Sequence, residues 1–148
     1  MRPDKDTYFL QMAVLVATRS TCARRAVGAV LVDAKGRVLS TGYNGVPARM
    51  PHCNSGRPED LCPGASAPSG TCLDQCMAIH AEMNAVIQCR DLDKVATAYI
   101  TVSPCIQCTK VLLNTGCQRL VFSTEYVQPE AKALWLKSGR VYTLHQGE

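Results

Sequence analysis

Two short motifs in the second half of the chain contain residue types that bind zinc. His80 and Glu82 are separated by one residue, and further along the chain Cys105 and Cys108 follow Pro104. Zinc prefers imidazole and thiolate ligands, and a catalytic zinc site has three protein ligands and one position open for water. We therefore expect His80, Cys105 and Cys108 to bind a zinc ion.

The spacing within each motif suits this chemistry. At the first turn of a helix, side chains three residues apart point the same way, and the backbone amides there favour the negative charge of Cys105 and Cys108. Pro104 is typical of a helix start. Glu82 lies two residues beyond His80 and is expected to reach the water that the metal holds. Glu82 is therefore predicted to be a proton shuttle and not a ligand.

In this order, His-x-Glu and Pro-Cys-x-x-Cys form the signature of zinc deaminases. Zinc lowers the pKa of a bound water toward neutrality. Glu82 would take the proton of that water, deliver it to a ring nitrogen and later protonate the leaving ammonia. Alone, Cys-x-x-Cys is equally typical of zinc ribbons and redox pairs, so the prediction of hydrolytic deamination depends on both motifs together.

Composition limits the remaining possibilities. The 148 residues are enough for one domain with a real core, spanning 1–148. The formal net charge of +4 suits a small anionic substrate as well as RNA, and 5% aromatic residues do not suggest a nucleic-acid platform. The chain shows no signal peptide and no apolar run of membrane-spanning length. Nine cysteines without a secretory signal favour reduced, metal-binding thiols in a cytoplasmic protein.

Hydrophobic periodicity predicts the elements of the first half. Apolar residues at three- and four-residue spacing indicate a helix over about 4–20, capped by Asp6 or Thr7. Two short runs at 27–33 and 37–43 indicate a hairpin. The residues from about 44 to 75 are rich in Cys, Pro and Gly and lack periodicity, which is unusual for a compact domain unless the segment is functional or cross-linked.

The second half alternates helices and strands. Helices are expected at about 73–90, 105–115 and 129–138, and strands at 96–102, 119–123 and 141–144. Glycines at 116 and 139 end two of these helices. The order predicts an α/β fold, a three-layer α/β/α sandwich around a mixed five-stranded sheet. The zinc ligands would lie at helix N-termini above one end of this sheet.

Three stretches resemble a known family. The segments 41–45 (Thr-Gly-Tyr-Asn-Gly), 80–85 (His-Ala-Glu-Met-Asn-Ala) and 103–108 (Ser-Pro-Cys-Ile-Gln-Cys) resemble the deoxycytidylate (dCMP) deaminases of the cytidine deaminase superfamily. The resemblance covers nearly the whole chain. It implies conversion of dCMP to dUMP for thymidylate synthesis, with the zinc ligands and proton shuttle as above and with Asn44 near the sugar of the substrate.

The resemblance also implies regulation. Members of this family are typically homohexamers that dCTP with magnesium activates and dTTP inhibits, and the regulatory nucleotide site between subunits involves Gly42, Tyr43, Asn44 and Gly45. Glycines on either side of Tyr43 and Asn44 would let the backbone approach a ligand closely. The alternative is that Gly42 and Gly45 only turn the chain out of a strand.

A second metal site is a separate hypothesis. Five cysteines precede His80, and four would complete a closed tetrahedral zinc site that pins the irregular segment. The expected ligands are Cys22, Cys53, Cys62 and Cys76, with Cys72 or His52 as replacements. Cys89 and Cys117 are interpreted as ordinary buried thiols.

Residues for the rest of the substrate are less defined by the sequence. Arg24, Arg25 and Arg90 are candidate phosphate ligands, since a guanidinium matches phosphate oxygens, although each could simply be a solvated surface residue. Tyr126 could pack over the substrate or belong to the core.

Four alternatives remain. A deaminase of tRNA or single-stranded nucleic acid needs aromatic residues and a basic track beside the pocket, whereas Phe and Trp together number only three here. A deaminase of free cytidine usually has cysteine in place of His80, and riboflavin-pathway deaminases share the zinc motif. A non-catalytic zinc scaffold would not need Glu82.

Overall fold

A single mixed sheet organises the protein. The computed structural model describes residues 1–65 and 77–146, and its five strands lie in the order β2-β1-β3-β4-β5. β1 pairs antiparallel with β2 and β3, whereas β3, β4 and β5 run parallel. The strands are β1 (Gly28–Asp33), β2 (Val38–Tyr43), β3 (Val95–Val102), β4 (Arg119–Thr124) and β5 (Val141–Leu144).

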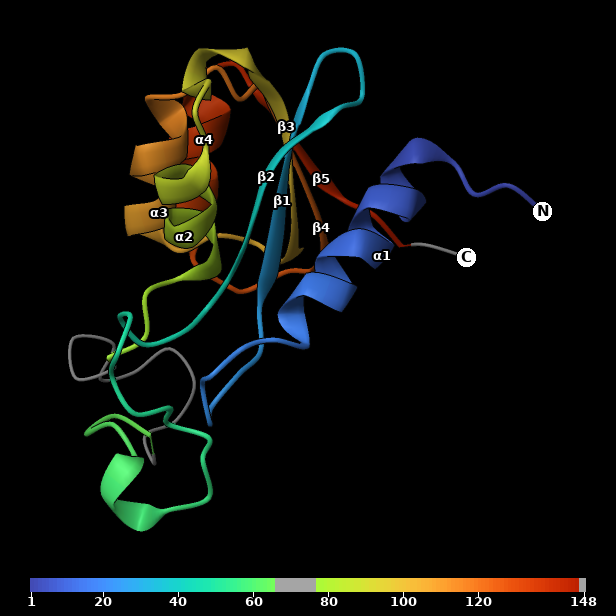
Figure 1. Ribbon diagram of the computed structural model, residues 1–148. Helices are drawn as coiled ribbons and strands as arrows, with labels where there is room; N and C mark the ends of the chain where they lie inside the picture. The colour runs from blue at the N-terminus through green and yellow to red at the C-terminus, as the bar shows by residue number, and fades with distance from the viewer. Residues whose placement is uncertain (66–76, 147–148) are drawn as a thin grey trace.

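Helices cover both faces of this sheet. The helices are α1 (Lys5–Ala17), α2 (Ala81–Gln88), α3 (Ile106–Leu113) and α4 (Pro129–Lys137). Figure 1 shows α1, in blue, on one face and the other three helices together on the opposite face. The predicted three-layer sandwich and the predicted order of helices and strands are confirmed. Among the described residues no helix is long and apolar enough to cross a membrane.

Each face has its own apolar core. Under α1, the helix residues Phe9, Leu10 and Ala13 pack against strand residues that include Tyr99 and Val121. Under α2, α3 and α4 lies a larger cluster: Ala29, Leu31, Ala81, Ala85, Val95, Ala98, Ile100, Leu112, Cys117, Leu120, Phe122 and Trp135. The central parallel strands β3 and β4 contribute buried residues to both clusters, which is why each contains a run of apolar residues, whereas the edge strand β5 is partly exposed.

The start of α1 differs from the prediction. Its cap is Asp4, whose carboxylate accepts a hydrogen bond from the Thr7 N–H at 2.7 Å, and not Asp6 or Thr7. Asp6 instead binds Arg119 of β4, with Oδ2 2.9 Å from Nη2, and accepts a hydrogen bond from the Tyr99 hydroxyl at 2.7 Å. An aspartate carboxylate suits both a helix cap and a tertiary ion pair, and spacing along the chain does not distinguish the two roles.

The predicted helix over 73–90 begins later than expected. Residues 73–76 lie outside the described residues. Ile79 is extended and pairs with Gly45 through backbone hydrogen bonds of 2.7 and 3.1 Å, and α2 begins only at Ala81. His80 therefore precedes the helix as its cap residue, and Glu82 lies in its first turn. The pairing with Gly45 prevents earlier helix formation, because it commits the backbone of Ile79 to an extended conformation.

The Cys, Pro and Gly-rich segment lies beside one end of the sheet. Between residues 46 and 65 the only helix is the short 3₁₀ turn Pro58–Asp60. Figure 1 shows this part of the chain, in teal and green, below the sheet at the end where α2 begins. Cys72 and Cys76 lie outside the described residues.

Candidate active site

The three predicted zinc ligands converge at the starts of two helices. His80 is the cap residue of α2, Cys105 is the cap residue of α3, and Cys108 lies in the first turn of α3. The His80 Nδ1 atom lies 3.5 Å from the Cys105 Sγ and 3.4 Å from the Cys108 Sγ. Among the described residues, these three form the only group of potential ligands whose atoms all lie within 4.8 Å of one another.

The geometry of this group fits zinc. Tetrahedral zinc with bonds of about 2.3 Å to sulfur and about 2.0–2.1 Å to nitrogen holds these two ligands about 3.6 Å apart. The observed separations of 3.4 and 3.5 Å agree with this value. Two thiols and an imidazole are also a typical zinc donor set, and three protein ligands leave a fourth position for water.

Hydrogen bonding makes Cys105 the more acidic of the two thiols. Donation from the Cys108 thiol, assisted by His80, lowers the pKa of Cys105 to about 4 in spite of its burial. The same bond to Cys105, together with burial, raises the pKa of Cys108. The hydrogen bond with Cys105 also raises the pKa of His80. The pocket thus already stabilises one thiolate, as a metal ligand requires.

Glu82 lies beside the ligand group without joining it. The side chain is 6% exposed and comes from the second residue of α2. Burial raises the pKa of the Glu82 carboxyl, partly offset by the backbone amide and by His80. A buried carboxyl with a raised pKa is a suitable group for general acid–base catalysis. The role of Glu82 as proton shuttle stays a prediction.

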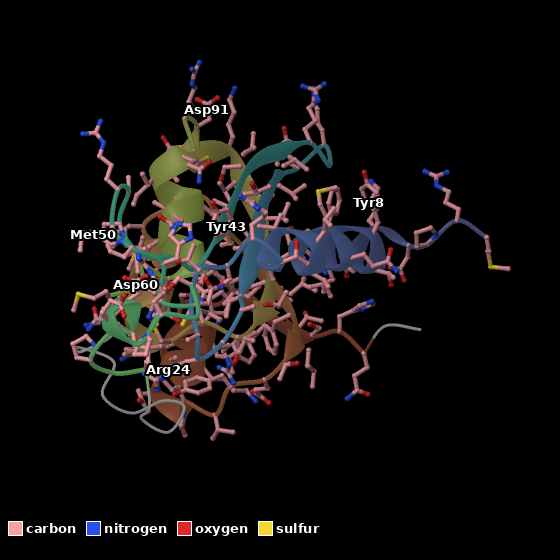
Figure 2. All side chains as sticks on the ribbon, turned by 60° about the horizontal axis from the view of Figure 1, so that its bottom comes forward. Tyr8, Arg24, Tyr43, Met50, Asp60 and Asp91 are labelled. Atoms are coloured by element: carbon pink, nitrogen blue, oxygen red, sulfur yellow. The ribbon has the colours of Figure 1, made fainter. Side chains whose placement is uncertain are left out.

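A hollow opens beside His80 and Glu82 at this end of the sheet. Its lining also includes Cys22, Arg24, Arg25, Val27, Asn44, Ala78, Ala81, Val102, Ser103, Cys105 and Tyr126. In Figure 2 Arg24 lies in the lower part of the view, whereas Asp91, which precedes β3, lies at the top. Of the three candidate phosphate ligands, Arg24 and Arg25 line the hollow, whereas Arg90 is exposed beyond the far end of α2.

Asn44 lines this hollow, but its side-chain amide already makes two hydrogen bonds to backbone groups. The side-chain oxygen accepts the Val27 N–H at 2.8 Å, and the amide nitrogen donates to the Arg25 carbonyl at 2.6 Å. Asn44 therefore holds the segment that carries Arg25. One lone pair and one N–H remain available to a ligand.

Tyr126 also lines the hollow. The Arg25 guanidinium lies 5.3 Å from the centre of its ring, in a cation–π contact. The Tyr126 backbone N–H donates to the buried Ser103 hydroxyl at 2.7 Å, which ties the backbone of Tyr126 to the residue that follows β3. Sequence reasoning missed Ser103 as a positioning residue, and its place two residues before Cys105 was the available signal.

The predicted regulatory stretch packs against α2. A Cβ atom on Gly42 would overlap the backbone of Ala81 and Ala85, so the absence of a side chain permits close packing of α2. The Asn84 amide donates to the Tyr43 carbonyl at 2.8 Å. Gly45 pairs with Ile79 as described above. These contacts connect the stretch to the helix that carries Glu82.

The structure describes some, but not all, of the cysteines outside the active site. Cys53 and Cys62 are buried, with their sulfurs 3.7 Å apart. The Asn54 N–H donates to the Thr21 carbonyl at 3.1 Å, which brings the segments containing Cys22 and Cys53 side by side. His52 is exposed, and Cys76 and Cys72 lie outside the described residues. Cys117 is buried, as predicted, and Cys89 is half-buried against the core.

Comparison with known proteins identifies the zinc-binding motif. Residues 3–124 match the family model described as the cytidine and deoxycytidylate deaminase zinc-binding region. The deoxycytidylate deaminase of Mycobacterium phage D29 is 42% identical over 127 residues, which cover 84% of this chain and 98% of that protein.

Other relatives are longer. The deoxycytidylate deaminase of Saccharomyces cerevisiae is 36% identical over 143 residues, covering 95% of this chain and 44% of the yeast protein. The Schizosaccharomyces pombe deoxycytidylate deaminase is 37% identical, with 95% and 43% covered. The chain thus spans less than half the length of these two relatives.

Solved structures share the fold. The dCMP deaminase of cyanophage S-TIM5, crystallised in complex with dCMP and dUMP, superposes with a TM-score of 0.69 at 24% identity, covering 98% of this chain and 99% of that one. From its motif match and from the phage relative of similar length, the chain belongs to the cytidine and deoxycytidylate deaminase zinc-binding family.

Proposed function

We propose that this protein catalyses hydrolytic deamination of dCMP to dUMP and ammonia. The observation that carries the proposal is the convergence of His80, Cys105 and Cys108 beside buried Glu82, in a hollow lined by arginine and asparagine. Relatives in two yeasts and a mycobacteriophage are named deoxycytidylate deaminase, which supports dCMP as the substrate.

The chemistry requires two proton transfers. Water adds to the ring carbon that bears the amino group, a ring nitrogen gains a proton, and the amine gains another before ammonia leaves. A zinc ion held by His80, Cys105 and Cys108 would act as a Lewis acid that makes water nucleophilic at neutral pH. Glu82, which lines the same hollow as His80 and Cys105, would take the water proton and deliver protons to the two nitrogens.

The lining of the hollow suits a nucleotide. Arg24 and Arg25 place two guanidinium groups at its lining, where a 5′-phosphate would be neutralised. The remaining hydrogen-bonding positions of Asn44 would meet the sugar, and Tyr126 offers a ring against which the substrate can pack. A free cytidine lacks the phosphate and would not use the arginines.

A deaminase of nucleic acid is the nearest alternative. Such enzymes hold the neighbours of a flipped base with aromatic and basic groups. Among the described residues, Tyr126 is the one aromatic side chain in the lining of the hollow. This favours a single free nucleotide over a strand.

Regulation by dCTP with magnesium, opposed by dTTP, is also proposed, through Gly42, Tyr43, Asn44 and Gly45 in a homohexamer. The hydrogen bond from Asn84 to Tyr43 supports this, because Asn84 and Glu82 share α2. A nucleotide that moves Tyr43 would thereby move the helix that carries the proton shuttle.

A structural zinc site is the second metal proposal. The close pair Cys53 and Cys62 would supply two ligands, and Cys22, whose segment runs beside that of Cys53, would supply a third after its sulfur moves closer, because the three sulfurs do not all lie within 4.8 Å of one another. Cys76 is the proposed fourth. Such a site would stabilise an irregular segment that has little apolar surface to bury.

The substrate proposal is tested by ammonia release from zinc-loaded protein. We expect turnover of dCMP, much slower turnover of CMP and cytidine, and a rate that rises with dCTP plus magnesium and falls with dTTP. Absence of turnover with every free nucleotide, in protein that retains zinc, would contradict the proposal and favour RNA substrates or a scaffold.

Metal analysis tests the second site in the same preparation. Two zinc ions per chain are expected, and substitution Cys53→Ser should reduce this to one without removing the zinc at Cys105. A wild-type content of about one zinc per chain would rule out the structural site.

A further inference from the structure

Gln128 is the cap residue of α4, yet its side chain serves a different helix. It makes no side-chain hydrogen bond to α4, and only its backbone carbonyl accepts from the first turn of that helix. Its side-chain oxygen instead accepts the N–H of Ile106 at 2.8 Å. Ile106 is the first residue of α3 and directly follows Cys105.

The start of α3 needs this external acceptor. The first amides of a helix have no partner within the helix, and the side chain of the cap residue usually satisfies one of them. Here the cap residue is Cys105, and the first-turn amide that its sulfur accepts is the Cys108 N–H, at 3.5 Å, not that of Ile106. Sulfur is a weak acceptor. Gln128 therefore supplies the carbonyl that a conventional cap would have provided for the Ile106 amide.

Ser103 joins the same two segments on the other side of Cys105. Its hydroxyl accepts the Tyr126 N–H at 2.7 Å, and its own N–H donates to the Thr124 carbonyl at 2.9 Å. Residues 124–128 are thus hydrogen-bonded to residues 103–106 both before and after Cys105. The segment so held includes Tyr126, the ring beneath the Arg25 guanidinium.

We propose that Gln128 is a positioning residue that fixes the Cys105 thiolate and the Tyr126 ring relative to each other. The inference rests on the zinc site assigned to His80, Cys105 and Cys108. Loss of the bond to Ile106 would free the start of α3 and loosen Cys105. It would also free the wall of the hollow at Tyr126, so that metal retention and substrate binding weaken together.

The test is the substitution Gln128→Met, which keeps the length of the side chain and removes its acceptor. The rate of zinc release from holoenzyme to a chromophoric chelator should rise about tenfold, the size typical when a group that orients a metal ligand is lost. The KM for dCMP should rise several-fold, with a smaller change in kcat. Gln128→Glu retains an acceptor at the same reach and should release zinc within about threefold of the wild-type rate.

Gln118→Met is the matched control, because the one hydrogen bond of the Gln118 side chain within the described residues is an exposed bond to the Gly116 carbonyl, at the other end of β4. Zinc release is measured without substrate and below the melting temperature of each variant, so it remains informative even if dCMP is not the substrate. A wild-type release rate in Gln128→Met, or equally fast release in Gln128→Glu, would overturn the inference. Ser103→Ala tests the second attachment, and it too should accelerate zinc release.

Discussion

The two faces of the sheet use their helices in different ways. α1 packs against β1, β3 and β4 through residues in the middle of the helix, namely Phe9, Leu10 and Ala13. On the opposite face α2 and α3 bring their first turns to one end of the sheet, where His80 and Cys105 are cap residues. The α1 face is held by packing and an ion pair, whereas the other face holds the proposed chemistry.

The difference shows what a helix start contributes beyond packing. Its unpaired amides and positive dipole favour anionic groups such as the thiolates and the carboxylate of Glu82. Both faces nevertheless require one glycine for close approach. A Cβ atom on Gly28 would overlap the backbone of α1, and one on Gly42 would overlap that of α2. The two faces can therefore be tested with matched substitutions.

The largest expected effect is that of Glu82→Gln. Turnover should fall at least about 10³-fold, because the amide cannot carry protons but keeps the shape of the carboxyl. Steady-state ammonia release and zinc content are the measurements, and zinc should be retained. Glu130→Gln is the control, since Glu130 is also the second residue of its helix but is exposed. Loss of folding or zinc in Glu82→Gln would instead support a scaffold role.

The next largest effects are expected from the matched glycine substitutions. Gly42→Ala and Gly28→Ala should each reduce the free energy of unfolding by about 2 kcal/mol, the usual cost of overpacking a core contact. Gly42→Ala should also lower kcat about tenfold, because it displaces the start of α2 and therefore Glu82.

Urea denaturation and dCMP kinetics on both variants separate the two effects. Equal losses of kcat in Gly42→Ala and Gly28→Ala would show that α2 has no special relation to catalysis.

The smallest effect concerns the ion pair on the α1 face. Burial raises the pKa of Asp6, but hydrogen bonds from Arg119 and Tyr99 outweigh it and hold the pKa below 3.8. A lowered pKa stabilises the fold above the unfolded-state value and loses that contribution as pH falls through the folded-state value. Asp6→Asn should therefore lose about 1 kcal/mol at pH 7 and progressively less below about pH 4.

Urea denaturation at pH 7 and pH 3 measures this change, with exposed Asp91→Asn as the control. Activity should remain at the wild-type level, since Asp6 lies on the face away from the site. A pH-independent deficit in Asp6→Asn would contradict the assigned ion pair.

Local pattern predicted the group of potential zinc ligands and the order of the elements. His80, Cys105 and Cys108 were predictable because ligand chemistry and helix-start spacing are encoded within a few residues, and the role of Glu82 as proton shuttle stays a prediction. Strands β1, β3 and β4 were predictable because each contains a run of buried apolar residues. The helix boundaries were less predictable. The start of α2 depends on the pairing of Ile79 with Gly45, which is a contact between segments distant in the sequence.

Only the tertiary structure decided which polar groups meet. The motif indicated that Asn44 lies near the substrate. It did not predict the two hydrogen bonds that the Asn44 side chain makes to the backbone of Val27 and Arg25. Gln128 carries no local sign of its bond to Ile106, and nothing near Asp6 indicates Arg119. Such partners are brought together by the packing of the sheet and its helices. Sequence spacing records only neighbours along the chain, so these contacts depend on the fold.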